Sequence, residues 1–361
     1  MRPTTTTELQ EIVKTGSQLL PRGGGSKPAL SVPGGTVVPI DMTGLSGLLE
    51  YEPGEYTFTA YAGTAVRDIQ RELAKNGQYL PFDPLLAARG ATLGGTIAAN
   101  SSGSGRYRYG GVRDFILGVR FVDGYGRLIR GGGKVVKNAA GFDLPKFMVG
   151  SLGGFGILAE VSFKVFPAPP AYTTLRLALA DVAAAMEAIF SLATRPLEMD
   201  ALDIFTTNSD VDLLIRLGGL PDALPARAER LRQLLAAHST AIETITDEAD
   251  EAALWQAAND LAWSAAAPLL VKVPIAPKRV VELDTAVTPH TTHRRYTAGG
   301  NVAWLAAPDA APLDAVLRKL GLAGLALRGT VVRPYLGQQP PSALLHRAAQ
   351  ALDPKGKFYR P

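Results

Sequence analysis

The chain contains no cysteine among its 361 residues. It therefore has no disulfide bond, no thiol nucleophile and no thiolate ligands for an iron–sulfur cluster. Histidine is also scarce, and of the four histidines only His290 and His293 are close together in the sequence. We interpret this pair as part of a surface loop, and we predict no metal site.

Long hydrophobic runs are missing as well. None reaches the roughly 18 to 20 residues that a transmembrane helix needs, and the N-terminal residues MRPTTTTELQEIVKTG lack the apolar core of a secretory signal. We expect a cytoplasmic protein, with any membrane association arising through partners. The 37 basic and 33 acidic residues give a net charge of only +4. Without a basic stripe interleaved with aromatic residues, the sequence predicts no nucleic-acid partner.

The composition changes near the middle of the chain. Glycine is concentrated in residues 1–156, where an Asp-Gly pair at 123–124 between two apolar runs predicts a β-hairpin. We expect helices over residues 8–20 and 65–76, the second with Thr64 as its N-cap and Gly77 at its end. The proline-rich residues 166–174 mark a boundary, beyond which Ala/Leu-rich helices alternate with strands. This order predicts an α+β fold in which helices cover antiparallel sheets.

Three glycine-rich stretches in the first half suggest that the main chain meets a large ligand there. The first, PRGGGSK at residues 21–27, is not an ATP-type phosphate loop, because Pro28 prevents a helix from starting at the lysine. The second covers residues 88–126 and the third residues 150–166. Residues 154–159 match the dinucleotide pattern G-x-G-x-x-A by letter, but a strand-like run follows, so a Rossmann motif is not indicated. One such stretch is consistent with tight turns, whereas three in this order favour a binding site.

These stretches resemble the FAD-binding domain of the vanillyl-alcohol oxidase / p-cresol methylhydroxylase (PCMH) superfamily. The resemblance rests on PRGGGSK, on LPFDP at residues 80–84, and on residues 90–118 and 137–166. Within the superfamily the chain is most similar to the FAD-binding subunits of bacterial glycolate oxidases. The resemblance implies a PCMH-type FAD-binding domain of two α+β subdomains (residues 1–168) and an α+β cap domain (residues 169–340). A C-terminal helix and tail (residues 341–361) would pack back on the FAD-binding domain.

The resemblance also implies which residues bind the cofactor. The loop from Gly23 to Lys27 would offer N–H groups to the FAD pyrophosphate, as runs of successive N–H groups commonly do for anions. Ser26 occupies the place of a histidine that bonds covalently to the flavin in some relatives, so we expect non-covalent FAD. The residues expected to bind FAD are Arg22, Gly23, Gly24, Gly25, Ser26, Lys27, Pro81, Phe82, Asp83, Gly90, Ala91, Thr92, Gly94, Gly95, Ala98, Ser101, Ser102, Gly103, Tyr109, Gly110, Gly156 and Ile157.

No catalytic residue can be assigned from the sequence. Oxidation of a 2-hydroxy acid needs a base and a cation for the carboxylate, and related catalytic subunits carry His-x-Gly-Asp-Gly-Asn-x-His in the cap. The nearest string, HRRYTAGGNVAW at residues 293–304, has no Asp between its glycines and no His after Asn301. Tyr359 in the closing DPKGKFYRP likewise stands where relatives carry Asn. The candidates for substrate contact are Arg294, Arg295, Arg333 and Tyr335, although such residues are more often structural or exposed to solvent.

The resemblance thus implies an FAD-binding redox subunit of a glycolate oxidase (glycolate dehydrogenase) complex. It would relay electrons between a catalytic FAD subunit and an iron–sulfur subunit, and the lack of cysteine agrees because any cluster must lie on another chain. The alternative is a free-standing FAD-dependent oxidase or dehydrogenase of an alcohol or 2-hydroxy acid. A third possibility is a scaffold that has lost FAD.

Overall fold

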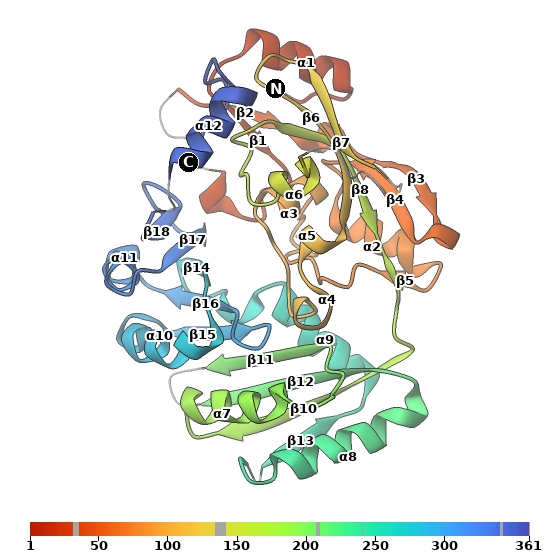
Figure 1. The fold of residues 1–361 in the computed structure, drawn as a ribbon, viewed down its shortest axis with the longest axis vertical. Coiled ribbons are helices and arrows are strands. Elements are labelled where there is room, and N and C mark those ends of the chain that lie inside the picture. The colour runs from red at the N-terminus through yellow and green to blue at the C-terminus, as the bar shows by residue number, and fades with distance from the viewer. Residues whose placement is uncertain (32–35, 134–141, 207–209, 240, 340–341, 361) are drawn as a thin grey trace. The chain divides into compact units, whose positions relative to one another are not determined.

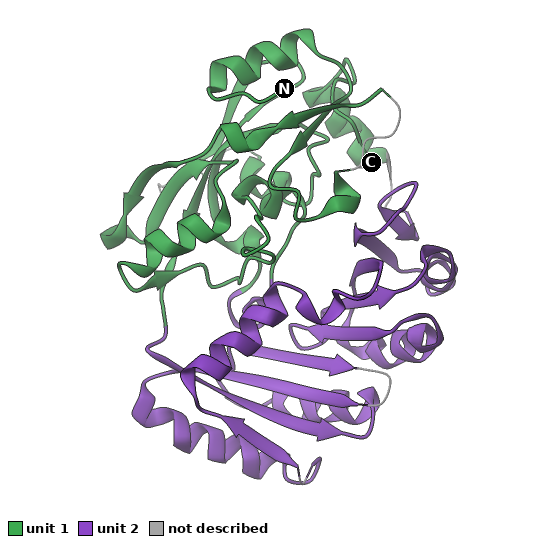
Figure 2. Ribbon diagram, turned by 180° about the vertical axis from the view of Figure 1, so that it is seen from behind, with its two compact units in different colours: residues 1–102, 110–168, 340–361 green, residues 103–109, 169–339 purple. Residues whose placement is uncertain are grey.

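The chain forms two compact units. The structure is a computed structural model that describes residues 1–31, 36–133, 142–206, 210–239, 241–339 and 342–360 (Figure 1). Unit 1 comprises Met1–Ser102, Gly110–Ala168 and Pro340–Pro361, and unit 2 comprises Gly103–Tyr109 and Pro169–Gln339 (Figure 2). Residues 32–35 of the opening stretch and residues 137–141 of the last resembling segment lie outside the described residues. In the described ranges, no helix is long and apolar enough to cross a membrane.

Unit 1 is built around a five-stranded antiparallel sheet with the order β3-β4-β8-β6-β7. Its strands are β3 (Leu48–Glu52), β4 (Thr57–Tyr61), β8 (Ile157–Lys164), β6 (Ile116–Val122) and β7 (Leu128–Gly132). Strands β6 and β7 pair in the hairpin predicted from the Asp-Gly turn, which is therefore confirmed. The Asp123 carboxylate closes this turn by accepting the N–H groups of Tyr125 at 3.0 Å and Arg127 at 2.9 Å.

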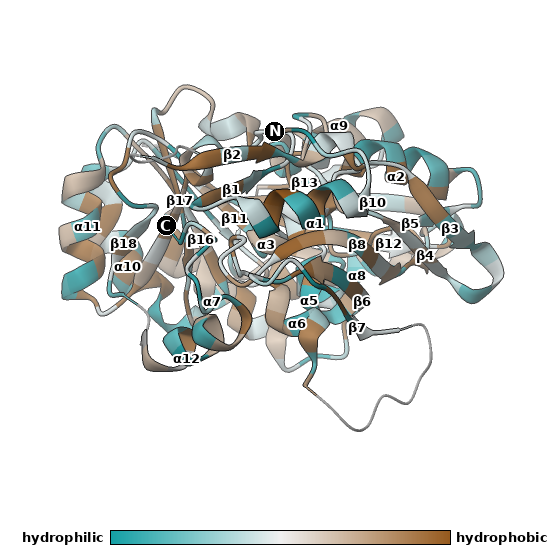
Figure 3. Cartoon of the chain, turned by 90° about the horizontal axis from the view of Figure 1, so that it is seen from above, coloured by the Kyte–Doolittle hydropathy of each residue, from teal (hydrophilic) through white to brown (hydrophobic). Residues whose placement is uncertain are grey.

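A parallel strand pair, β1 (Leu19–Arg22) and β2 (Val38–Asp41), carries the first glycine-rich loop directly after β1. Helix α1 (Thr6–Thr15) alternates hydrophobic and hydrophilic residues (Figure 3) and buries Leu9 and Val13 against Phe358 from the C-terminal segment. The Lys357 ammonium donates to three main-chain carbonyls at the end of α1, which fastens this segment to the N-terminal helix. The remaining elements of unit 1 are α2 (Val66–Ala74), β5 (Gln78–Tyr79), α3 (Leu93–Ala98), α5 (Val112–Phe115), α6 (Leu144–Met148), β9 (Phe166–Pro167) and α12 (Ser342–Leu352).

Two local predictions in unit 1 differ from the structure. The first helix ends at Thr15 rather than at residue 20, because the chain turns into β1 at Leu19. Thr64 is not the N-cap of α2, and that prediction is wrong. Its hydroxyl instead donates to the carbonyl of Tyr61 at 2.7 Å and accepts the N–H of Gly47 at 2.9 Å, so it joins two loops.

Unit 2 contains a nine-stranded antiparallel sheet made from two consecutive β-α-β-β-α-β repeats. The strand orders β13-β10-β12-β11 and β15-β16-β14-β17 are the same ferredoxin-like order in opposite directions, and the repeats join where β11 pairs with β15. The predicted antiparallel sheet with covering helices is confirmed. The first repeat contains β10 (Ala171–Leu179), α7 (Val182–Ala193), β11 (Ala201–Thr206), β12 (Val211–Gly219), α8 (Leu224–Leu235) and β13 (Ile242–Ile245). After α9 (Glu248–Asn259), the second contains β14 (Leu269–Pro274), α10 (Val280–Val287), β15 (His293–Thr297), β16 (Val302–Ala307), α11 (Ala310–Lys319) and β17 (Ala323–Arg328), and β18 (Tyr335–Gly337) extends the edge.

A buried polar cluster holds residues 103–109, which include α4 (Arg106–Tyr109), within unit 2. The Ser104 hydroxyl donates to the Asp203 carboxylate at 2.5 Å and accepts from the Arg295 guanidinium at 2.8 Å. Arg295 also forms an ion pair with Asp203, and all three side chains are buried. These seven residues therefore differ from the predicted boundary, which placed them in the FAD-binding domain.

Candidate functional site

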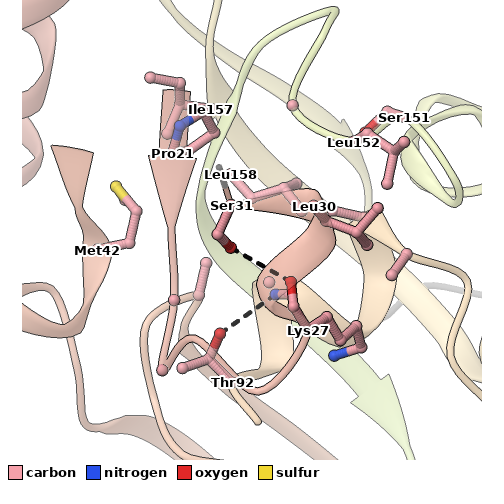
Figure 4. A pocket seen from close by; sticks show the side chains of 18 of the residues that line it. Pro21, Lys27, Leu30, Ser31, Met42, Thr92, Ser151, Leu152, Ile157 and Leu158 are labelled. Carbon is pink, nitrogen blue, oxygen red and sulfur yellow. Dashed lines mark hydrogen bonds between the residues drawn. The ribbon is translucent and has the colours of Figure 1, made fainter. Parts of the chain in front are cut away.

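The three glycine-rich stretches meet at one pocket in unit 1 (Figure 4). The loop after β1 supplies one wall, α3 a second, and the segment that leads into β8 a third. Main-chain hydrogen bonds from Gly94 to Ala62 and from Ala62 to Ala159 connect α3 to the sheet and so bring two of these walls together. The pocket is lined by Pro21, Gly23, Gly24, Gly25, Ser26, Lys27, Leu30, Ser31, Met42, Ala62, Thr92, Gly94, Gly95, Ala98, Ala99, Ser151, Leu152, Gly153, Gly156, Ile157 and Leu158.

The consecutive glycines of the first wall are needed for different reasons. A Cβ atom on Gly24 would overlap the carbonyl of Gly90, and one on Gly23 would overlap the Thr92 hydroxyl. Gly25 has a φ of +71°, which disfavours other residues, and a Cβ there would meet nothing within 4 Å. The first two glycines thus allow two loops to touch, while Gly25 turns the chain beside open space.

The same loop has donors available for a ligand. In the described part of the chain, none of the main-chain N–H groups of residues 23–27 donates a hydrogen bond to another protein group. Successive free N–H groups in a tight loop form a concave site for an anion even without a helix dipole. The loop can therefore bind phosphate oxygens.

Lys27 is the one titratable side chain among the residues that line the pocket. The residue is 6% exposed, and its ammonium lies 3.4 Å from the hydroxyl of Ser26. Because burial penalises the charged form, the pKa of Lys27 is lowered to about 8. The pocket thus contains a cation without a counter-charge among its lining residues.

A further polar atom in the pocket wall is unsatisfied. The hydroxyl of Ser151 is buried and has no hydrogen-bond partner among the described residues. FAD carries an anionic pyrophosphate and several hydroxyl groups, which match the free N–H groups, the Lys27 ammonium and this hydroxyl. The residues present therefore fit the cofactor that the resemblance implies.

Half of the predicted cofactor residues do not line this pocket. Phe82 is fully buried, with its ring centroid 5.6 Å from that of Phe115 and 5.9 Å from that of Phe163. Tyr109 belongs to unit 2, where its hydroxyl donates to Asp200 at 3.0 Å. Contact of these residues with FAD stays a prediction. The predicted residues outside the lining are Arg22, Pro81, Phe82, Asp83, Gly90, Ala91, Ser101, Ser102, Gly103, Tyr109 and Gly110.

Other lining residues were not predicted from the sequence. Ser151 and Gly153 lie inside the third glycine-rich stretch, so including every small residue of that stretch would have found them. Leu30 and Ser31 follow the first stretch, and extending it by a few residues would have found them too. Met42 and Ala62 carry no such signal, because only tertiary packing brings them to the pocket. The unpredicted lining residues are Pro21, Leu30, Ser31, Met42, Ala62, Ala99, Ser151, Leu152, Gly153 and Leu158.

The paired arginines proposed as substrate contacts are engaged within unit 2. Arg294 forms an ion pair with Asp284 at 2.6 Å, and Arg295 pairs with Asp203. Both guanidinium groups are at least nine-tenths buried, so the carboxylates that face them neutralise their charge inside the unit. Neither arginine presents a free cation to a substrate carboxylate.

The string that partly matches the catalytic motif is a hairpin turn between β15 and β16. Gly299 and Gly300 have φ values of +65° and +88°, and the Asn301 amide donates to the carbonyl of Ala298 at 2.7 Å. The turn itself therefore requires the two glycines and uses the asparagine, so these residues do not indicate a catalytic motif. Arg333 is exposed, while burial raises the pKa of Tyr335.

Comparison with known proteins identifies a matching family and several relatives of this chain. Residues 1–132 match the family described as FAD binding domain. The chain is 37% identical over 224 residues to the glycolate oxidase subunit GlcE of Escherichia coli (strain K12), covering 62% of each chain. It is 31% identical to the glycolate oxidase subunit GlcD of Bacillus subtilis (strain 168), over 52% of this chain and 41% of the relative. It is 29% identical to a D-2-hydroxyglutarate dehydrogenase of Xanthomonas citri pv. viticola, over 56% of this chain and 44% of the relative. The chain thus matches less than two thirds of the length of each of these relatives. The family match and the similarity to GlcE confirm the predicted resemblance.

The fold of the chain is similar to that of a solved alkyldihydroxyacetonephosphate synthase. The TM-score is 0.73, and the similarity covers 99% of this chain and 74% of the other at 15% sequence identity. At this identity the similarity shows the fold alone. Because it covers almost the entire chain, it supports the α+β architecture of both units.

Proposed function

Because residues 1–132 match the FAD binding domain family, we propose that this chain is the FAD-carrying redox subunit of a glycolate oxidase complex. The proposed partners are a catalytic FAD subunit and an iron–sulfur subunit, between which this chain relays electrons. The similarity to GlcE and GlcD supports this assembly, and the lack of cysteine requires that any iron–sulfur cluster lie on another chain. In this proposal the complex is cytoplasmic, and any membrane attachment comes from the partner subunits.

One contrast between the two units carries the proposal. The pocket of unit 1 offers unpaired N–H groups and an ammonium without a counter-charge, as a cofactor site requires. In unit 2, by contrast, the adjacent Arg294 and Arg295, which were candidates for contact with a substrate carboxylate, are already paired with aspartates. The described residues therefore provide a site for a flavin, but they show no evident set of groups that would oxidise a hydroxy acid.

Each wall of the pocket has a definable task in binding. The loop N–H groups and Lys27 bind the anionic part of the cofactor. Gly25 turns the main chain at positive φ and places no side chain between the loop and the ligand. The small residues of α3 allow an extended ligand to lie against the helix, and the Ser151 hydroxyl offers a hydrogen bond. Bound FAD would supply the group that accepts and returns electrons.

The proposal is tested by anaerobic mixing of the purified, FAD-loaded chain with excess glycolate. We expect the visible flavin band to persist when the chain is alone, and to bleach when the catalytic subunit is added. Transfer of electrons from the reduced flavin to a dye should require the iron–sulfur subunit as well. Dithionite is the control, because it must bleach the flavin of the lone chain and so show that it can be reduced.

Rapid bleaching of the lone chain by glycolate would contradict the relay. The chain would then be a free-standing dehydrogenase of a 2-hydroxy acid. D-lactate and D-2-hydroxyglutarate would be the next substrates to mix, because dehydrogenases named for them are among the relatives.

A further inference from the structure

Hydrogen bonds hold the main chain of Lys27 in place. Lys27 is the N-cap of the short 3-10 helix Pro28–Leu30, and its carbonyl accepts the N–H of Leu30 at 3.1 Å. The Ser31 hydroxyl donates to the same carbonyl at 3.5 Å (Figure 4). The residue is nearly inaccessible to solvent and lines the pocket between the glycine loop and α3. Lys27 is thus a buried residue that is anchored in the wall of the pocket.

No charge on the described lining residues balances this ammonium. Its hydrogen-bond partner in the described part of the chain is the neutral Ser26 hydroxyl. The glycine loop, the 3-10 helix, α3 and the start of β8 present no other titratable or charged side chain among the lining residues, and their polar groups are Ser31, Thr92 and Ser151. Since a buried charge is costly unless it is paired, an ammonium in such a pocket is suited to a ligand that brings its own negative charge.

We propose that Lys27 supplies a positive charge that partly offsets the negative charge of the FAD pyrophosphate, and that binding of FAD drives this side chain fully into its protonated form. The proposal deepens the assignment of the pocket as the FAD site and rests on it. Oxidised FAD has a neutral flavin ring at neutral and mildly alkaline pH, so its anionic group in this range is the pyrophosphate. Lys27 therefore couples the affinity for FAD to pH.

The direction of this coupling follows from the two protonation states. Burial lowers the pKa of Lys27 to about 8 in the free protein, so the side chain loses its charge as the pH rises through that value. A bound anion favours the charged form and raises the pKa again. Protonated Lys27 then binds FAD more tightly than neutral Lys27, and by linkage FAD binding takes up a proton. The affinity should be level below about pH 8 and fall by up to about tenfold per pH unit above it.

Calorimetric titration of FAD into the FAD-free chain tests this inference. Titrations at a pH near 8.5, in two buffers with different ionisation enthalpies, give the number of protons taken up on binding. We expect uptake of a large fraction of one proton by the wild-type chain. Lys27→Gln should bind FAD more weakly near pH 7 and take up no proton, and its affinity should no longer fall between about pH 8 and pH 9.

Two further variants separate this role from a general effect of charge or folding. Lys27→Arg keeps a permanent charge and should bind FAD without proton uptake and with an affinity that is level across this range. Lys75→Gln removes an exposed lysine elsewhere in unit 1 and should behave as wild type. Wild-type binding without proton uptake, or the same uptake in Lys27→Gln or Lys27→Arg, would overturn the inference. Failure of the wild-type chain to bind FAD at all would instead contradict the proposal that this pocket is the FAD site.

Discussion

A Cβ atom on residue 24 would occupy the same space as the carbonyl oxygen of Gly90. The two glycine-rich loops that carry these residues therefore touch through their main chains at the edge of the pocket. Residue 24 has to be glycine for this contact, whatever ligand the pocket holds.

Gly24→Val should consequently separate the two loops and empty the pocket. We expect the FAD content of the purified protein to collapse and unit 1 to lose about 1–3 kcal/mol of stability, the usual cost of overpacking. The measurement is the ratio of flavin to protein absorbance, together with thermal unfolding. Gly54→Val is the matched control in the same unit, because a Cβ there meets nothing within 4 Å. Full flavin content in Gly24→Val would show that the loop is not part of the site.

The glycine loop illustrates what the sequence could and could not predict. Its composition predicted that the bare main chain meets a ligand, and the family resemblance implied that this ligand is a pyrophosphate. The structure does place residues 23–27 on the pocket wall. The reason for Gly24, however, is a contact with Gly90, a residue 66 positions further along the chain. Such a requirement depends on tertiary packing and leaves no mark in the local sequence.

The flavin should be held without a covalent bond. Ser26 stands where some relatives carry the histidine that bonds to the flavin, and a hydroxyl in this loop is not expected to replace it. We expect acid precipitation to release all yellow colour into the supernatant, as absorbance of the two fractions would show. Flavin fluorescence on the washed, denatured protein would contradict this expectation.

The cap was predicted in outline only. Ala/Leu-rich helices alternating with strands indicated an α+β layer, which is confirmed, but the duplication of the β-α-β-β-α-β repeat was not recognised. Helix α10 has only eight residues, and β15 carries His293, Arg294 and Arg295, which made this segment look like a polar loop. The pairing of β11 with β15 across the two repeats, together with Asp203 opposite Arg295, explains why these charges are buried.

Asp203→Asn should destabilise unit 2 strongly. It leaves the buried Arg295 without its counter-charge, and breaking a buried ion pair typically costs about 3–5 kcal/mol. All three tryptophans of the chain lie in unit 2, so their fluorescence during urea unfolding reports on this unit. Asp212→Asn is the matched control, because its partner Arg176 is half exposed and the loss should stay below about 1 kcal/mol. Equal losses in the two variants would show that Asp203 does not neutralise Arg295.

Lys27 should make the FAD-free protein less stable at neutral pH. The pKa of Lys27 is about 8 in the folded protein, against 10.5 for an unperturbed lysine side chain, so folding opposes its charge. This penalty is fully present below about pH 8 and fades as the pH rises from there toward 10.5, where the unfolded chain also loses the proton.

Lys27→Met, which keeps an unbranched side chain that is one heavy atom shorter and removes its charge, should therefore stabilise the FAD-free chain at neutral pH. The upper limit is roughly 3–4 kcal/mol, since each unit of the difference between pKa 10.5 and about 8 corresponds to roughly 1.4 kcal/mol. The gain should shrink near pH 10 and should reverse in saturating FAD, where the charge has a partner. Circular dichroism of urea unfolding near pH 7 and near pH 9.5, with Lys75→Met as the exposed control, measures both effects. A Lys27→Met protein that is less stable than wild type at neutral pH without FAD would mean that the buried ammonium already has a counter-charge in the folded chain.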